Sequence, residues 1–252
     1  MLQVEGLTKS FDGFTAVADV DLVVEPGAVH AVIGPNGAGK TTLFNLVTGV
    51  LAPTAGRLRL EGQDITGWRP DRITRRGVAR TFQNIRLFRD MTTVENVMVG
   101  AHCRTSGGFL TAVARVPGRT GRGERETIRR ADELLELVGL TDKRDVAAAD
   151  LTLVEQRRLE IARALATGPH LLLLDEPAAG MTLAEIKDVN RLILRIRERG
   201  VTVLLTEHHM SLVMQVSDRI TVLNYGRKIA EGRPEAVRRD PEVLAAYLGA
   251  DP

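Results

Sequence analysis

One short segment constrains this chain more than any other feature. An apolar run, residues 29–33, leads into a bend that carries three glycines and ends in a lysine and a hydroxyl residue. Two glycines, a lysine and a threonine at these offsets match the nucleotide-binding loop pattern, a coincidence expected by chance in about one chain in a few hundred. The segment predicts a strand, a phosphate-binding loop and a helix. The loop residues are Gly34, Pro35, Asn36, Gly37, Ala38, Gly39, Lys40 and Thr41.

The residue types of this bend suggest its chemistry. Glycines allow backbone curvature that a side chain would obstruct, so successive N–H groups converge on phosphate oxygens at the positive end of the following helix. Lys40 is expected to reach the β- and γ-phosphates of a nucleoside triphosphate, and Thr41 to ligate Mg²⁺. The next residue, Thr42, is included in the predicted nucleotide site. The alternative is a tight strand-to-helix turn with an exposed lysine.

A second apolar run ends in two acids. Residues 171–174 are four consecutive leucines, followed by Asp175 and Glu176. Such a strand delivers both carboxylates to the C-terminal edge of a parallel sheet, where open α/β folds bind ligands. We expect Asp175 to hold Mg²⁺ through water and Glu176 to polarise the attacking water as a general base. By itself an Asp-Glu pair is also typical of a helix N-terminus, which is the alternative.

The remaining chain shows two kinds of periodicity. The opening residues alternate as in an antiparallel hairpin with a turn at Asp12-Gly13, whereas residues 87–167 are mainly helical in pattern. The predicted fold class is therefore α/β: a P-loop NTPase core of the RecA-like type, with an N-terminal antiparallel β subdomain and an inserted α-helical subdomain. Residues 1–86 and 168–252 would form the core of one nucleotide-binding domain that covers residues 1–252.

Composition excludes several classes of protein. The 252 residues include 44% hydrophobic and 26% charged residues with a formal net charge of +2, which indicates a globular chain and not a collagen-like or disordered one. Cys103 is the single cysteine, which fits a reducing cytoplasm. Arginines alternate with acids along the predicted helices, which argues against a nucleic-acid partner. Residues 104–126 are rich in Gly, Arg, Ser and Thr and predict a mobile surface loop.

Three further segments carry a resemblance to a known family. Together with the phosphate loop and the acidic strand end, they resemble the ATPase subunit of ABC transporters over essentially the whole chain. They are Arg80-Thr81-Phe82-Gln83-Asn84, the run from Arg157 to Leu165, and Glu207-His208-His209. In finer detail, residues 81–88, 176–180 and 241–249 resemble the cassettes of branched-chain amino-acid importers, a likeness that importers of urea and short amides share.

The resemblance implies a role for individual residues. Gln83 would contact Mg²⁺ and the water while relaying motion to the membrane subunit, and His208 would contact the γ-phosphate. Phe11 would stack on adenine, with Phe14 as a rival and core packing as the alternative. Without the resemblance, Gln83 would be an ordinary surface amide and His208 a structural histidine.

One segment departs from the family pattern. Leu151-Thr152-Leu153-Val154-Glu155 stands where the family has Leu-Ser-Gly-Gly-Gln, at a helix N-terminus that contacts the γ-phosphate bound on the opposite subunit. The resemblance implies that contact for Thr152. Val154 would obstruct close backbone approach, and Glu155 places negative charge near a phosphate. The alternative is a good helix start, with Thr152 and Glu155 forming a capping box.

These expectations describe the ATP-hydrolysing subunit of an ABC importer that uses ATP and Mg²⁺ at the cytoplasmic face of the cell membrane. Its expected partners are membrane permease subunits, a second ATPase subunit and, indirectly, a solute-binding protein. The altered segment favours a heterodimer over a homodimer, because a partner with an intact segment could complete the site on this chain. The alternative is an ATP-binding subunit with weak hydrolysis in a regulatory or structural role. A small-molecule kinase would explain neither His208 nor the helix at 157–165.

Overall fold

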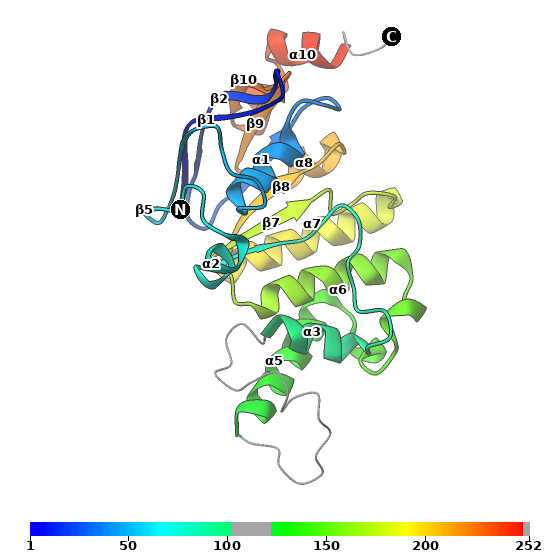
Figure 1. Ribbon diagram of the computed structural model, residues 1–252. Helices are drawn as coiled ribbons and strands as arrows, with labels where there is room; N and C mark the ends of the chain where they lie inside the picture. The colour runs from blue at the N-terminus through cyan, green and yellow to red at the C-terminus, as the bar shows by residue number, and fades with distance from the viewer. Residues whose placement is uncertain (102–121, 249–252) are drawn as a thin grey trace. The chain divides into compact units, whose positions relative to one another are not determined.

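The computed structural model describes residues 1–101 and 122–248, which divide into two compact units (Figure 1). The first unit is Met1–Arg80 with His170–Pro252, and the second is Thr81–Pro169. Most of the predicted loop at 104–126, and Cys103 with it, lies outside the described residues. Its last part, from residue 122 on, is the start of a helix and not a loop.

An antiparallel sheet of four strands, in the order β2-β1-β4-β5, begins the first unit. Phe11 pairs with Phe14, so the hairpin turns at Asp12-Gly13 as predicted. Both turn residues have positive φ, 37° and 91°, which is the requirement that Asp-Gly turns meet between twisted strands. The strands are β1 (Leu2–Phe11), β2 (Phe14–Val24), β4 (Ala55–Leu60) and β5 (Gln63–Asp64).

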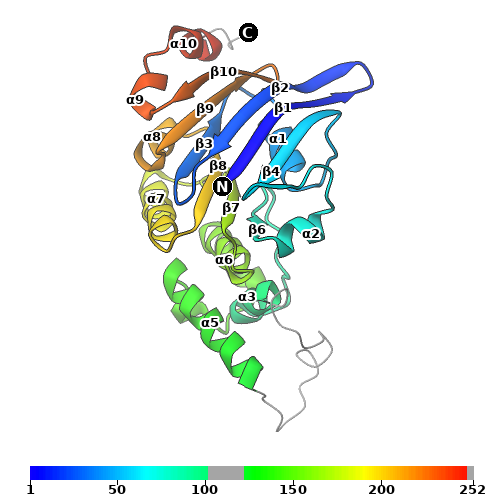
Figure 2. The ribbon, with the colours of Figure 1, turned by 90° about the vertical axis from the view of Figure 1, so that its left-hand side faces the viewer.

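A six-stranded sheet in the order β10-β9-β3-β8-β7-β6 forms the other layer of this unit (Figure 2). Its five neighbouring strands from β9 to β6 are parallel, and β10 is an antiparallel edge strand. Every residue of β3, β7 and β8 is buried, as expected for central strands of a parallel sheet. The strands are β3 (Val29–Ile33), β6 (Val78–Arg80), β7 (Leu171–Asp175), β8 (Thr202–Thr206), β9 (Arg219–Asn224) and β10 (Arg227–Gly232).

Helix α1 (Lys40–Val47) joins the two sheets, because its apolar residues pack into one core with residues of both. Phe44 is fully buried there, which contributes about 2 kcal/mol of hydrophobic stabilisation. Figure 2 shows α7 and α8 on the other side of the six-stranded sheet. The other helices of this unit are α2 (Pro70–Arg75), α7 (Leu183–Glu198), α8 (Met210–Val216), α9 (Pro234–Val237) and α10 (Pro241–Leu248).

The second unit is built from helices, as its periodicity predicts. Helices α3 (Thr93–Ala101), α5 (Arg122–Val138) and α6 (Leu153–Ala166) pack on one another. Gly100 permits the close approach of α3 to α6, because a Cβ there would lie 2.1 Å from the carbonyl oxygen of Arg163. Gly139 follows α5 with φ of 71°, the left-handed conformation that commonly ends a helix.

Candidate functional site

The bend between β3 and α1 needs glycine at defined points. Gly34 has φ of 151°, and a Cβ there would lie 2.1 Å from the carbonyl oxygen of Leu223 in β9. Gly39 has φ of 100°, and its Cβ would lie 2.5 Å from the carbonyl oxygen of Ala16. The bend is held from outside by Gly226, whose N–H donates to the Ala38 carbonyl at 3.1 Å. The loop is therefore shaped by its neighbours as well as by its own residues.

The N-terminus of α1 is open. Gly39 occupies the N-cap position, no side chain among the described residues caps the helix, and its first turn contains no acid. The N–H groups at the start of a helix have no partner within the helix, and they carry a partial positive charge. Thr41 and Thr42 follow Lys40 in this first turn. Such an end is suited to an anion.

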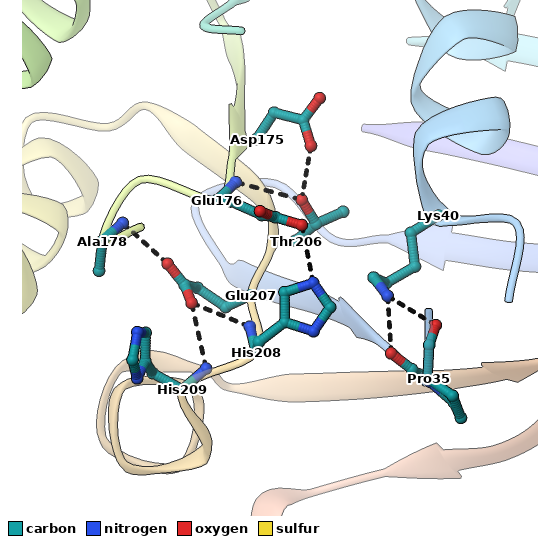
Figure 3. A network of polar contacts seen from close by, with 10 residues as sticks. Pro35, Lys40, Asp175, Glu176, Ala178, Thr206, Glu207, His208 and His209 are labelled. Atoms are coloured by element: carbon teal, nitrogen blue, oxygen red, sulfur yellow. Dashed lines mark hydrogen bonds and ion pairs between the residues drawn. The ribbon is translucent and has the colours of Figure 1, made fainter. Parts of the chain in front are cut away.

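Lys40 folds back over the loop. Its Nζ donates to the carbonyl oxygens of Gly34 at 2.6 Å and Pro35 at 2.9 Å (Figure 3). Burial holds the pKa of Lys40 below its usual 10.5, while the negative charges of Glu176 and Asp175 act in the opposite direction. The predicted lysine and the two predicted acids thus share one electrostatic environment.

The two acids lie at the end of β7, as the sequence predicts: Asp175 is the last residue of the strand and Glu176 follows it. Asp175 is buried, and its Oδ1 accepts a hydrogen bond from the Thr206 hydroxyl at 2.8 Å. Glu176 has φ of 49°, an uncommon conformation for a residue with a side chain, and strain of this kind is concentrated at functional sites. Its Oε1 lies 2.7 Å from Nε2 of His208 (Figure 3). The structure therefore brings the predicted general base and the predicted histidine into direct contact.

His208 and His209 lie in the turn between β8 and α8. Glu207, which our sequence analysis did not include in the site, organises this turn. It is 1% exposed, and its carboxylate accepts from the N–H groups of Ala178 at 2.8 Å, His208 at 2.9 Å and His209 at 3.1 Å. The sequence could have indicated this role, because Glu207 lies between a strand and a helix N-terminus, where unpaired N–H groups need an acceptor.

The two aromatic candidates lie at the tip of the β1–β2 hairpin. Phe11 is 41% exposed and Phe14 is 65% exposed, so core packing explains neither ring. The ammonium group of Lys9 lies 4.9 Å from the centre of the Phe11 ring. Both rings are thus solvent-exposed, and that of Phe11 already has a cation over it.

Gln83 and Thr152 belong to the second unit and are described within it. Arg157 of α6 donates to the backbone carbonyls of Phe82, at 2.8 Å, and of Gln83. Thr152 is the N-cap of α6 and forms a capping box with Glu155. The Glu155 carboxylate accepts from the Thr152 N–H at 2.8 Å, which is the main cause of the lowered pKa of Glu155. The helix-start alternative for this segment is therefore present in the structure.

The donors of the first unit fit Mg²⁺. The Thr41 hydroxyl and the Asp175 carboxylate are oxygen ligands, and Mg²⁺ is commonly held by one or two such groups together with phosphates and waters. Within residues 1–101 and 122–248, no group of three or more His, Cys, Asp or Glu side chains could hold a metal without further ligands. The phosphates of a nucleotide would supply the missing ligands.

Comparisons with known proteins agree with this geometry. Residues 17–179 match the family model described as ABC transporter. The chain is 49% identical to the high-affinity branched-chain amino acid transport ATP-binding protein BraF of Pseudomonas aeruginosa, over 99% of this chain and 98% of that protein. This chain belongs to the ATP-binding family of ABC transporters. It is therefore an ATP-binding cassette, of the family whose ATPases power transport.

Three further similarities refine the placement of this cassette within its family. It is 44% identical to LivG of Escherichia coli strain K12, another high-affinity branched-chain amino acid transport ATP-binding protein, over 99% of this chain and 98% of that one. A crystal structure of an ABC transporter cassette in its ADP conformation superposes with a TM-score of 0.86 at 33% identity, covering 99% of this chain and 98% of that one. Residues 227–252 match a second model, described as branched-chain amino acid ATP-binding cassette transporter.

These findings confirm the expected family and the expected α/β fold. The relatives are named as transport proteins, and none of the names supports a regulatory or structural role with weak hydrolysis. Among the described residues, no helix combines the length and the apolar character needed to cross a bilayer.

Proposed function

We propose that this cassette hydrolyses ATP to drive an importer of branched-chain amino acids or a related small polar solute, bound peripherally at the cytoplasmic face of the cell membrane. The contact between Glu176 and His208, in the same unit as the open N-terminus of α1, supports the hydrolytic role most directly. The match of residues 227–252 and the names of the relatives support the class of solute.

The proposed mechanism assigns a task to each group. Lys40 and the N–H groups of the α1 start bind the β- and γ-phosphates, and Phe11 stacks on adenine. Thr41 and Asp175 would hold Mg²⁺, which neutralises charge on the phosphates when bound. Both carboxylate oxygens of Asp175 accept hydrogen bonds, from Thr206 and from Arg80, so this acid is suited to contact through a metal-bound water.

The hydrolytic step itself falls to Glu176 and His208. Glu176 orients a water in line with the γ-phosphorus and accepts its proton as the bond to ADP breaks. His208 holds the Glu176 carboxylate through Nε2 and contacts the γ-phosphate as it develops charge. Because Glu207 fixes the backbone of the His208 turn, this pair is positioned before substrate arrives.

The proposed partners are permease subunits, a second ATPase subunit and, through the permeases, a solute-binding protein. The second unit, with Gln83, would form the inserted helical subdomain that contacts the permeases. Thr152 would face a nucleotide bound on the partner ATPase. A heterodimer is favoured. The phosphate loop of this chain is intact, and a partner that has the family sequence Leu-Ser-Gly-Gly-Gln in place of residues 151–155 could complete the nucleotide site on this chain.

The site assignment is tested by measuring ATP binding and turnover of the purified chain with its transporter partners. Glu176→Gln should retain ATP binding and slow turnover by at least about a hundredfold, since it removes the general base. The control is Glu235→Gln, an exposed acid in the first turn of α9, which should leave both unchanged. Near-normal turnover by Glu176→Gln would contradict the assigned role.

Two further measurements address the assembly. Purification of the native complex, followed by identification of the solute it carries, distinguishes a branched-chain amino acid from urea or a short amide. Comparison of turnover per subunit for this chain alone and for its mixture with the partner ATPase tests the asymmetry. Equal turnover per subunit in the two samples would rule the heterodimer proposal out.

A further inference from the structure

A buried arginine stands beside the acidic half of the nucleotide site. Arg80 is the last residue of β6 and pairs in register with Leu173 of β7, two residues before Asp175. Its side chain is 6% exposed and that of Asp175 is 4% exposed. Nη2 of Arg80 donates to Oδ2 of Asp175 at 2.7 Å. A charge at this depth is costly unless it is paired, so the two groups depend on each other.

The other side of the same guanidinium contacts α1. Nη1 of Arg80 donates to Oδ1 of Asn45 at 2.6 Å and to the hydroxyl of Thr48 at 3.3 Å. The guanidinium carbon lies 5.6 Å from the centre of the Phe44 ring on the same helix. Arg80 therefore ties the helix that starts at the phosphate loop to the strand that ends in the acids. The planar guanidinium group has several N–H donors and can bind both elements at once, whereas the single ammonium group of a lysine cannot.

The pair also changes the charge that the site presents to a nucleotide. The carboxylates of Asp175 and Glu176 both act on Lys40, so they lie close enough to influence a phosphate bound there. Each such carboxylate repels a polyphosphate unless a cation offsets it. The guanidinium of Arg80, in direct contact with Asp175, is a permanent cation of the protein itself.

We propose that Arg80 is a positioning residue that sets how strongly nucleotide binding depends on Mg²⁺. It fixes the Asp175 carboxylate and offsets its charge, so that ATP can enter the site before the metal and find Asp175 already in place. This inference rests on the proposed nucleotide site and names a residue that acts through Asp175.

The test compares two dissociation constants of the full-length chain by calorimetry, one for ATP with Mg²⁺ and one for ATP in EDTA. Arg80→Met should weaken metal-free binding by about tenfold and binding with Mg²⁺ by less than about threefold, because the metal can replace the lost cation. Arg76→Met, an exposed arginine paired with Glu61, is the matched control and should change neither constant. An equal loss in both constants would indicate a merely structural role and overturn the proposal.

Two other variants keep the test decisive if Arg80→Met does not fold. Arg80→Lys retains the charge and should bind metal-free ATP within about threefold of the parent chain. Asp175→Asn removes the repelling charge and should tighten metal-free binding, while weakening binding with Mg²⁺. Combining Arg80→Met with Asp175→Asn should return metal-free binding close to the parent value.

The outcomes separate this inference from the proposed function. If the parent chain binds ATP and Asp175→Asn leaves metal-free binding unchanged or weaker, the charge offset is wrong and the nucleotide site stands. If the parent chain binds ATP under neither condition, the proposed function fails, and this inference with it.

Discussion

Two helix N-termini of this cassette differ in how their unpaired backbone N–H groups are satisfied. The start of α1 has glycine at its N-cap and no acid in its first turn, whereas the start of α6 has Thr152 at its N-cap and Glu155 three residues later. Each helix start presents N–H groups that need an acceptor. At α6 the chain supplies that acceptor itself, and at α1 it leaves the position to a ligand. A helix N-terminus can therefore bind an anion more readily when no side chain of the protein caps it.

A third helix shows that the α6 arrangement is an ordinary structural one. Thr182 and Glu185 form the same capping box at the start of α7. In the family resemblance, the start of α6 would contact a phosphate on the opposite subunit. In this chain the Glu155 carboxylate accepts from the N–H and the hydroxyl of Thr152, so a phosphate there would have to compete with it for these donors and would meet its negative charge. We therefore expect the start of α1 to bind phosphate strongly and the start of α6 to bind it weakly.

The largest expected effect comes from giving α1 the carboxylate that α6 carries. Thr42 occupies in α1 the third helical position that Glu155 occupies in α6. Thr42→Glu should weaken ATP binding by about a hundredfold, because a carboxylate would take the N–H groups and repel the phosphates. Thr42→Gln is the control of similar size without the charge. Calorimetry measures the ATP affinity of both variants. An unchanged affinity in Thr42→Glu would contradict the proposed difference between the starts of α1 and α6.

The second prediction concerns how each region is held together. The box at α6 joins residues three apart, whereas Glu207 receives the N–H of Ala178 across 29 positions of the chain. Glu207→Ala should lower the free energy of unfolding by about 2 kcal/mol, since one buried and two partly buried N–H groups lose a charged acceptor. Denaturant unfolding measures it. Glu207→Gln, which keeps one acceptor oxygen but not the charge, should lose less, and a stability unchanged in Glu207→Gln would refute the role of the charge.

A third change should open the start of α6. Glu155→Gln removes the negative charge but keeps a side chain that can still reach back to Thr152, so turnover of the assembled transporter should rise about fivefold. The gain should persist when this chain also carries Glu176→Gln, because the site that we propose α6 completes lies on the partner subunit. No gain in either background would mean that Glu155 does not obstruct the phosphate.

Acid should loosen the start of α6 and spare that of α1. The pKa of Glu155 is lowered from its usual 4.5, chiefly by the Thr152 N–H. A carboxyl whose pKa is lower in the folded helix stabilises it when ionised, so this stabilisation is present above about pH 4.5 and lost as the pH falls below that value. Hydrogen exchange at the amide of Gln156, corrected for its intrinsic rate, should accelerate a few-fold below pH 4 in the parent chain. Equal acceleration in Glu155→Gln would assign the effect to another group.

Local patterns were predicted well because short stretches of backbone decide them. The bend at residues 34–41, the hairpin turn at Asp12-Gly13 and the two acids at the end of β7 all appear where the sequence placed them. The capping box at Thr152 was one of two alternatives that the sequence left open. A strand of three residues, β6, was missed because it is too short to show any alternation.

Contacts between distant residues could not be predicted from the same patterns. Arg80 and Asp175 are 95 positions apart and meet only because β6 lies next to β7 in the sheet. The partner of a buried charge depends on strand order, and strand order does not appear in local periodicity. The bond between Glu207 and the N–H of Ala178 could not be predicted for the same reason, because these residues are 29 positions apart.

The amino-acid sequence by itself determined the glycine-rich bend before α1, the two acids at a strand end and the family to which this chain belongs, because spacing and residue type encode backbone shape over a few residues. Only the tertiary structure decided that Glu176 faces His208, that Glu207 fixes their turn and that Arg80 is paired with Asp175. Those contacts arise when strands far apart in the chain become neighbours, and the energy of a buried charge depends on that neighbour.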